Sequence, residues 1–237
     1  MKVITLGEIL LRFSTRKEIR IKSTDEFRVC YGGAETNVGL SLSQFGHKVS
    51  ATSVLPESNP LSDAILSRLQ GYGVDTNLIM KKPGRLGTYY LEQGNSVRGS
   101  KVTYDRKYSS IAMLDNLCWD LDEIFIEADL LHISGILPAL SKKWQSWTVE
   151  IIRKAKEYGC YVSFDMNYRS KLWSYEEAYP CFQQILPYVD ILSAGRLDAI
   201  HFLKVASEDE DVLLEEIYKR VQAKYPNIKV LYSTKRN

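Results

Sequence analysis

The stretch YGGAETNVGL, residues 31–40, guides the interpretation of this sequence because it joins a pair of glycines directly to a predicted helix. Gly32 and Gly33 lack a Cβ atom, so the backbone ahead of the helix is free of the restriction that a side chain imposes. Four apolar residues then recur at helical spacing, namely Ala34, Val38, Leu42 and Phe45. This spacing predicts a helix whose apolar stripe packs on a sheet.

The first turn of this predicted helix is a candidate ligand site. Its amide groups have no partners within the helix, and the helix dipole adds partial positive charge there. Asn37 lies one turn inside the helix and offers both a donor and an acceptor to a hydroxyl group. An ordinary turn that uses glycines for its geometry would explain the same residues, so this stretch by itself leaves both interpretations open.

The composition is typical of a globular protein. The 237 residues are 45% hydrophobic and 25% charged, and a chain of this length can bury a sizeable core. The formal net charge is +2, with charges of both signs mixed along the chain. Charge therefore gives no reason to expect nucleic acid or a membrane as a partner.

The cysteine and histidine residues predict neither disulfides nor a metal site. The four cysteines are scattered without a Cys-x-x-Cys pair, and the three histidines stand far apart. The chain opens on a strand-like run at residues 3–6 without a signal-peptide pattern, and no apolar run approaches membrane-spanning length. We therefore expect a soluble, cytoplasmic protein.

Strand-like and helical segments alternate along the chain. Short apolar runs predict strands near residues 2–6, 48–55, 128–133, 161–164, 189–193 and 228–232. Helical periodicity and capping residues predict helices at 59–71, 142–158, from 174 onward and at 208–225. Asn59 and Pro60 suit the start of the first of these helices, and Ser174 and Glu177 have the spacing of a capping box. Strands separated by helices favour right-handed βαβ units, and hence an α/β fold with a doubly wound, mostly parallel sheet in a three-layer arrangement. No repeat or linker divides the chain.

One region departs from this alternation. Residues 86–92 and 101–106 are polar, tyrosine-rich strands around a turn and predict a β-hairpin. With the strand-like runs near 10–13 and 26–31, they predict a small second sheet, a lid formed by about 10–31 and 86–111. Tyr104 and Arg106 share one face of the hairpin, which suits a polyol that bears a carboxylate. Strands with a solvated polar face remain the alternative.

Polar residues also follow two predicted strands of the main sheet. FDMNYR at 164–169 leaves one strand, and SGI at 134–136 leaves another. In an open parallel sheet, ligands bind beyond the carboxyl ends of the strands. These segments and the Gly32–Gly33 turn are therefore predicted to converge on one crevice. In the alternative, Asp165 and Arg169 only cap loops.

With these motifs the whole chain resembles the N-terminal part of a ribokinase-type (PfkB) carbohydrate kinase. The general features are a Gly-Glu pair after the first strand, GGAETN at 32–37, GYGVD at 71–75 and the polar hairpin. The resemblance is strongest to 2-keto-3-deoxygluconate kinases. It is carried by GRLGTYY at 84–90, YDR at 104–106, SGI at 134–136 and, above all, FDMNYR at 164–169.

This resemblance implies a ribokinase-like fold with a lid, ATP and Mg²⁺ as cofactors, and a small sugar acid as substrate. The substrate-binding residues that it implies are Gly33, Asn37, Tyr89, Tyr104, Arg106, Ile136, Asp165 and Arg169. Two arginines suit such a substrate, because the sugar acid carries a carboxylate that ribose and fructose lack.

The sequence departs from the family pattern in two places. The family's Asn-x-x-Glu is replaced by GRLD at 195–198, where Asp198 is the residue assigned to Mg²⁺ and the nucleotide, as a hard oxygen ligand. The Gly-Ala-Gly-Asp motif, which holds the catalytic base in the family, is expected beyond Asn237, so the domain over 1–237 is expected to be incomplete. No Walker-type loop replaces that motif. We therefore expect the 237-residue chain to be inactive by itself.

Two classes of function fit these observations. The first is transfer of the ATP γ-phosphoryl group to a hydroxyl of a keto-deoxy sugar acid. The second is a non-catalytic protein that binds a sugar acid or dimerises; a fructokinase-like kinase is a further alternative. An NAD-dependent oxidoreductase is disfavoured, because no Gly-x-Gly-x-x-Gly follows the first strand. The resemblance also implies a homodimer joined through the lid.

Overall fold

The computed structural model describes residues 1–234, and the chain divides into two compact units. Unit 1 combines Met1–Leu6 with the chain from Trp119 onward, and unit 2 is Gly7–Cys118. None of the helices in the described part of the chain combines the length and the apolar character needed to cross a bilayer.

Unit 1 contains a parallel sheet in the order β11-β10-β9-β8-β1. Its strands are β1 (Lys2–Leu6), β8 (Leu130–Ser134), β9 (Tyr161–Asp165), β10 (Ile191–Ser193) and β11 (Val230–Tyr232). The register pairs Ser134 with Asp165, Asp165 with Ser193, and Ser193 with Tyr232. The final residues of four strands therefore form one row at the carboxyl edge of the sheet.

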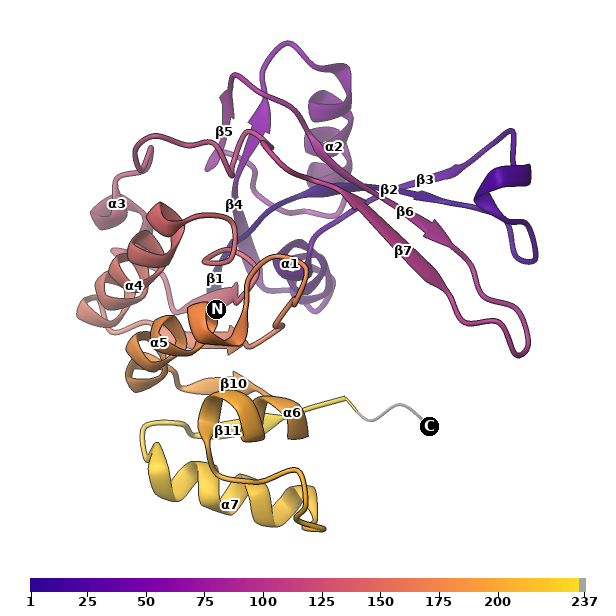
Figure 1. Ribbon diagram of the computed structural model, residues 1–237. Coiled ribbons are helices and arrows are strands. Elements are labelled where there is room, and N and C mark those ends of the chain that lie inside the picture. Colours follow the sequence, from indigo (N-terminus) through magenta and orange to yellow (C-terminus); the bar gives the residue numbers. More distant parts are fainter. Residues whose placement is uncertain (235–237) are drawn as a thin grey trace. The chain divides into compact units, whose positions relative to one another are not determined.

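Helices connect these strands. They are α3 (Leu121–Phe125), α4 (Lys142–Glu157), α5 (Tyr175–Ile185), α6 (Arg196–Asp198) and α7 (Leu214–Lys224), with the short turns η2 (Leu186–Tyr188) and η3 (Ala199–Leu203). α4 and α5 pack side by side (Figure 1). The Ser141 side chain caps α4, and Ser174 and Glu177 form the expected capping box of α5.

Unit 2 contains a parallel pair of strands and two helices. The strands are β4 (Lys48–Pro56) and β5 (Ile79–Lys82), and the helices are α1 (Ala34–Gln44) and α2 (Pro60–Gly71). β4 is buried along almost its whole length. The Asn59 side chain caps α2 ahead of Pro60, as the sequence predicts.

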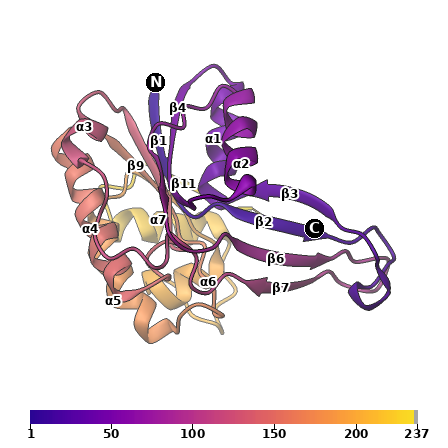
Figure 2. The same ribbon diagram turned by 90° about the horizontal axis from the view of Figure 1, so that it is seen from above.

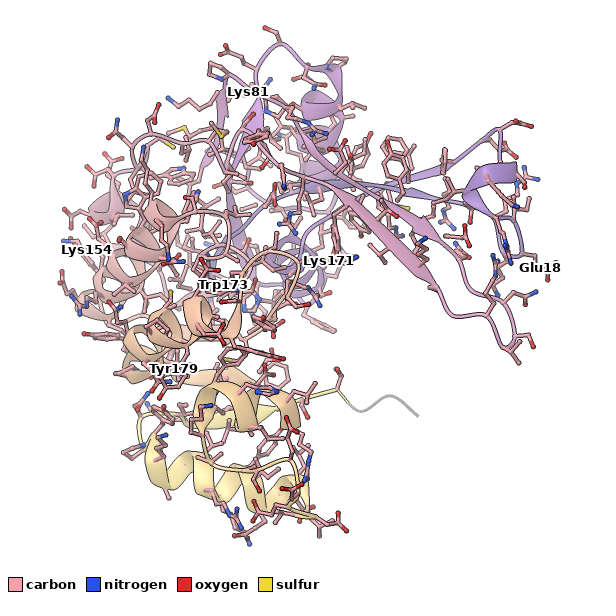
Figure 3. All side chains as sticks on the ribbon, viewed as in Figure 1. Glu18, Lys81, Lys154, Lys171, Trp173 and Tyr179 are labelled. Atoms are coloured by element: carbon pink, nitrogen blue, oxygen red, sulfur yellow. The ribbon has the colours of Figure 1, made fainter. Side chains whose placement is uncertain are left out.

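A four-stranded small sheet completes unit 2. Its strands are β2 (Leu10–Ser14), β3 (Arg28–Gly32), β6 (Gly87–Glu92) and β7 (Lys101–Asp105), and η1 (Ile21–Ser23) lies between β2 and β3. Figure 2 shows them side by side in the order β3-β2-β6-β7. Phe13, Phe27 and Tyr90 form an aromatic cluster in this sheet. Glu18, labelled in Figure 3, lies in the loop that follows β2.

The α/β class and the second small sheet are thus confirmed, but two details of the prediction are wrong. The buried residues of α1 are Glu35, Thr36 and Gly39, whereas Phe45, predicted to lie on the apolar stripe, is 79% exposed. The side chain of Glu35 packs against Gly7, so a polar residue occupies the face that periodicity gave to apolar ones. The last helix begins at Leu214 and not near residue 208.

The buried imidazole of His132 should make stability depend on pH. His132 is 3% exposed, and burial lowers its pKa from 6.5 to about 4. Below pH 6.5 the unfolded chain therefore gains a proton that the folded chain does not, and stability falls as the pH falls toward 4. We expect this residue to cost about 2 kcal/mol of unfolding free energy between pH 7 and pH 5.

Urea denaturation at both pH values measures this loss. A His132→Gln variant removes the titrating ring while keeping a polar group for the Ser163 hydroxyl, which lies 3.0 Å from His132 Nδ1. Its stability should therefore fall by about 2 kcal/mol less than that of the wild type over the same pH interval. Equal losses in the two proteins would show that His132 does not cause the pH dependence.

Candidate functional site

The carboxyl edge of the sheet in unit 1 opens into a cavity of about 410 Å³. Asp165 and Ser193, the final residues of β9 and β10, line part of this cavity, and residues of α6 and η3 line another part. The lining residues are Asp165, Asn167, Tyr168, Arg169, Tyr175, Ser193, Gly195, Arg196, Leu197, Asp198, His201, Phe202, Ser233 and Thr234. The structure thus brings three predicted residues, Asp165, Arg169 and Asp198, to one cavity.

Asp165 is a carboxylate that burial makes harder to ionise. Burial raises its pKa, and the Ser193 side chain, the Asn167 backbone and the charge of Arg169 oppose that shift. Arg169 itself is exposed. Its guanidinium group is therefore open to solvent beside a carboxylate, an arrangement that can bind an anionic ligand.

Asp198 is the second carboxylate of this cavity. Its Oδ2 accepts a hydrogen bond of 2.8 Å from the Gly195 backbone amide. Burial raises its pKa, the Gly195 amide opposes the shift, and the negative charge of Asp165 adds to it. Because the pKa of each carboxyl group is raised, a nearby cation would stabilise the ionised form of both.

These oxygen ligands fit Mg²⁺ in one particular manner. Among the described residues, no group of three or more His, Cys, Asp or Glu side chains could hold a metal ion by itself. Mg²⁺, however, is usually held by one or two carboxylates together with water and phosphate oxygens of the substrate. Asp198 and Asp165 are suited to that role when a nucleotide supplies the remaining ligands.

The loop after β9 is fixed by aromatic packing. Trp173 is 5% exposed and packs edge-on against Phe182, with ring centroids 5.2 Å apart (Figure 3 labels Trp173). The Tyr168 hydroxyl donates a hydrogen bond of 2.9 Å to the Trp173 carbonyl oxygen. Asn167 has a φ of +37°, a region that few residues other than glycine adopt. Such strain commonly accompanies ligand-binding segments.

Tyr175 and His201 are among the cavity residues that were not identified from the sequence. Tyr175 stacks between Tyr168 and His201, with ring centroids 4.6 Å and 4.2 Å away respectively. His201 lies three residues after Asp198, and this spacing places both residues near one side of a helical segment. That spacing is the sequence signal for His201, whereas the position of Tyr175 depends on the tertiary structure.

SGI at 134–136 turns sharply after β8. The Gly135 amide donates to the Asp165 carbonyl oxygen at 2.9 Å, and a Cβ atom on Gly135 would clash with the Met166 carbonyl oxygen. The close approach of these two loops explains the glycine. Ile136 has a buried side chain, and its amide donates to the Ser134 hydroxyl.

In unit 2, Gly33 is the N-cap residue of α1 and supplies no side-chain cap. A Cβ atom there would clash with the Glu8 carbonyl oxygen, so the glycine allows a close backbone approach. Asn37 lies one turn into α1, is exposed, and lines a hollow of about 320 Å³ with Leu40 and Tyr72.

The predicted hairpin pair Tyr89 and Tyr104 face one another across β6 and β7. Their ring centroids are 5.8 Å apart. Arg106 follows β7 directly, and its guanidinium carbon lies 5.9 Å from the Tyr104 ring centroid. The structure therefore brings these three predicted residues together within unit 2.

Arg106 is engaged by an internal partner that the sequence did not reveal. It is 6% exposed and forms an ion pair with Glu8, which is 3% exposed and also accepts a hydrogen bond from the Ser109 hydroxyl. Glu8 belongs to the Gly-Glu pair after the first strand. The charge of Arg106 is thus compensated inside unit 2, which the prediction of a carboxylate-binding arginine did not anticipate.

Comparison with protein families gives a match to the pfkB family carbohydrate kinases over residues 1–232. The chain belongs to this family. Family members share the scaffold described above, and the match spans both units. The ribokinase-like fold expected from the resemblance is therefore confirmed.

Several relatives are similar over most of the chain. A 2-dehydro-3-deoxygalactonokinase from Haloferax volcanii is 35% identical over 83% of this chain, and a 2-dehydro-3-deoxygluconokinase from Bacillus subtilis is 29% identical over 73% of it. The chain spans 61% and 53% of the lengths of these two relatives.

Two solved structures match closely. A PfkB family carbohydrate kinase from Listeria grayi is 43% identical with a TM-score of 0.94, covering 100% of this chain and 72% of that one. A 2-dehydro-3-deoxygluconokinase from Thermotoga maritima is 40% identical with a TM-score of 0.93, covering 98% and 72% of the two chains.

Removing one partner of the buried Arg106–Glu8 ion pair should strongly destabilise the folded protein. Glu8→Gln leaves a buried guanidinium without its counter-charge, and we expect the unfolding free energy to fall by about 3–5 kcal/mol. The exposed pair Arg16–Glu26 offers a matched control. Glu26→Gln should change the unfolding free energy by no more than about 1 kcal/mol. Urea denaturation of both variants makes the comparison, and equal effects would contradict the assignment.

Proposed function

We propose that this chain forms part of an ATP-dependent kinase that phosphorylates a hydroxyl group of a 2-keto-3-deoxy sugar acid. The observation that carries the proposal is the similarity to relatives whose names specify such sugar acids, combined with a match to the pfkB family over nearly the whole chain. An exposed arginine in the cavity of unit 1 agrees with an anionic substrate.

Arg169 is proposed to bind the substrate carboxylate. Its guanidinium group can form two parallel hydrogen bonds to a carboxylate, which gives affinity and fixes orientation. Asn37, Tyr89 and Tyr104 offer polar groups that suit the sugar hydroxyls. Gly33 and Ile136 are proposed to contribute backbone groups and shape, and Asp165 a hydrogen-bond acceptor.

ATP is the proposed phosphoryl donor, and Mg²⁺ is proposed to accompany it. Asp198 would hold the metal, which, when bound, neutralises charge on the phosphate oxygens. The residues of the chain contribute mainly by positioning, because phosphoryl transfer depends on alignment and on charge stabilisation. We assign the catalytic base to none of the described residues.

Binding of the sugar acid tests this proposal without requiring turnover. Isothermal titration calorimetry should show 2-keto-3-deoxygluconate binding well ahead of fructose and ribose, because only the acid has a carboxylate. Arg169→Ala should weaken binding of the acid by about 1.5–3 kcal/mol, the value of one charge-assisted hydrogen bond.

Lys171→Ala is the matched control, because this exposed cation lies in the same loop but does not line the cavity. It should leave the affinity nearly unchanged. Equal binding of the three sugars by the wild type would contradict a sugar-acid kinase and favour a fructokinase-like one. Tight binding of the acid without nucleotide binding would favour the non-catalytic alternative.

We also propose a homodimer formed through the small sheet. β3 and β7 are its edge strands, and an edge strand that lacks a neighbour is prone to pair with another chain. Val29 on β3 is 45% exposed and adds apolar surface. A two-fold contact through such an edge would be self-complementary.

Light scattering at micromolar concentration should give the mass of a dimer. Val29→Asp should shift the protein toward the monomer, because the substitution places a charge on the proposed interface. Val97→Asp, in the exposed turn of the hairpin, should leave the dimer intact. A monomeric wild type would rule out the contact.

A further inference from the structure

A second arginine, Arg196, lines the cavity in unit 1 together with Arg169. Arg196 is the first residue of α6, two residues ahead of Asp198, which is proposed to hold Mg²⁺. Ala194 and Gly195 connect it to Ser193, the final residue of β10. The chain therefore brings Arg196 to the carboxyl edge of the sheet, close in sequence to the proposed metal ligand.

The guanidinium group of Arg196 is anchored by a neutral acceptor. Arg196 is half-buried, and its Nη1 donates a hydrogen bond of 2.8 Å to the Val212 carbonyl oxygen. Within residues 1–234 it takes part in no ion pair. A carbonyl oxygen orients the guanidinium group without cancelling its charge, so the remaining N–H groups are available to an anion.

One carboxylate near Arg196 is already bound by another cation. Arg220 is the main cause of the lowered pKa of Glu210, and the charge of Arg196 contributes less to that shift. The distance between Arg220 Nη1 and Glu210 Oε1 is 2.7 Å. Because Glu210 has its own counter-charge, an anion in the cavity does not have to displace it from Arg196.

The two arginines of the cavity come from different strand ends. Arg169 follows β9, and its charge acts on Asp165, the final residue of that strand. Arg196 follows β10 and precedes Asp198. The proposed reaction needs two anions, the carboxylate of the sugar acid and the phosphate chain of the nucleotide. With Arg169 assigned to the carboxylate, Arg196 is the arginine of the cavity that remains for phosphate.

Charge balance in the cavity supports this division. Asp165 and Asp198 bring negative charge to the place where a negatively charged phosphate chain would bind. Phosphoryl transfer depends on cations that offset the charge of the phosphate oxygens. A guanidinium group beside the proposed Mg²⁺ ligand would supply such a cation from the chain itself.

We propose that Arg196 is a binding residue for the phosphate chain of the nucleotide. This inference rests on the proposed function and adds a residue to it. The planar guanidinium group can form two parallel hydrogen bonds to phosphate oxygens, and its half-buried setting strengthens the interaction relative to water. The hydrogen bond to the Val212 carbonyl oxygen holds the group in place before the ligand binds.

Calorimetric titration with two ligands tests this role. The ligands are inorganic triphosphate, with Mg²⁺ at a fixed concentration, and 2-keto-3-deoxygluconate. Arg196→Met should raise the Kd of triphosphate at least about tenfold, the equivalent of one charge-assisted contact, and leave the Kd of the sugar acid unchanged. Arg169→Ala should have the opposite pattern. Arg196→Lys should lie between the wild type and Arg196→Met, because it keeps the charge but loses the planar fork.

Arg153→Met is the matched control. Arg153 is an exposed arginine on α4 of the same unit, and it does not line this cavity. This variant should bind both ligands as the wild type does. A loss of triphosphate binding equal to that of Arg196→Met would indicate a general effect of surface charge and would overturn the inference. Circular dichroism melting curves establish that each variant is folded, and Arg196→Lys decides the question if Arg196→Met does not fold.

The outcomes separate this inference from the proposed function. If Arg196→Met binds triphosphate as tightly as the wild type, or if the wild type does not bind triphosphate, the role of Arg196 is wrong. Equal losses of triphosphate and sugar acid in Arg196→Met would also overturn it, since they would indicate a structural effect. A wild type that binds triphosphate through Arg196 but does not bind the sugar acid would instead contradict the proposed function.

Discussion

Parallel pairing with a fixed register is the constraint on which the site in unit 1 depends. Because all strands of that sheet run in one direction, Ser134, Asp165, Ser193 and Tyr232 end in one row. The loops that leave these strands must start from the same edge, which gathers residues that are far apart in the sequence. The clash that any side chain on Gly135 would create with the Met166 carbonyl shows how closely two of these loops approach. Backbone hydrogen bonding between the strands therefore determines where the cavity lies, and the side chains determine its chemistry.

A buried ion pair connects distant segments of unit 2. Glu8 is almost completely buried, and it is compensated by Arg106 and by the Ser109 hydroxyl. A buried carboxylate without such partners would be very costly, so the ion pair fixes the start of the chain segment after β1 to the end of β7.

Family membership and site geometry determine different properties of this protein. Family membership fixes the scaffold, and a scaffold of this kind can serve kinases of different specificity. The structure adds the exposed guanidinium group of Arg169 and the raised pKa values of the Asp165 and Asp198 carboxyl groups. These properties depend on burial and on neighbouring charges, and relatives' names do not determine them.

The sequence by itself determined the order of strands and helices, the small sheet and the family, because alternation, capping residues and glycine motifs are local signals. Asn59 and the Ser174–Glu177 box were predicted correctly for that reason. Only the tertiary structure decided the buried face of α1, the partner of Arg106 and the position of His201 in the cavity. Glu8 and Arg106 lie 98 residues apart, and no local pattern encodes a contact between them. Burial and charge pairing are properties of the folded chain, and they decided that Arg106 is compensated by Glu8.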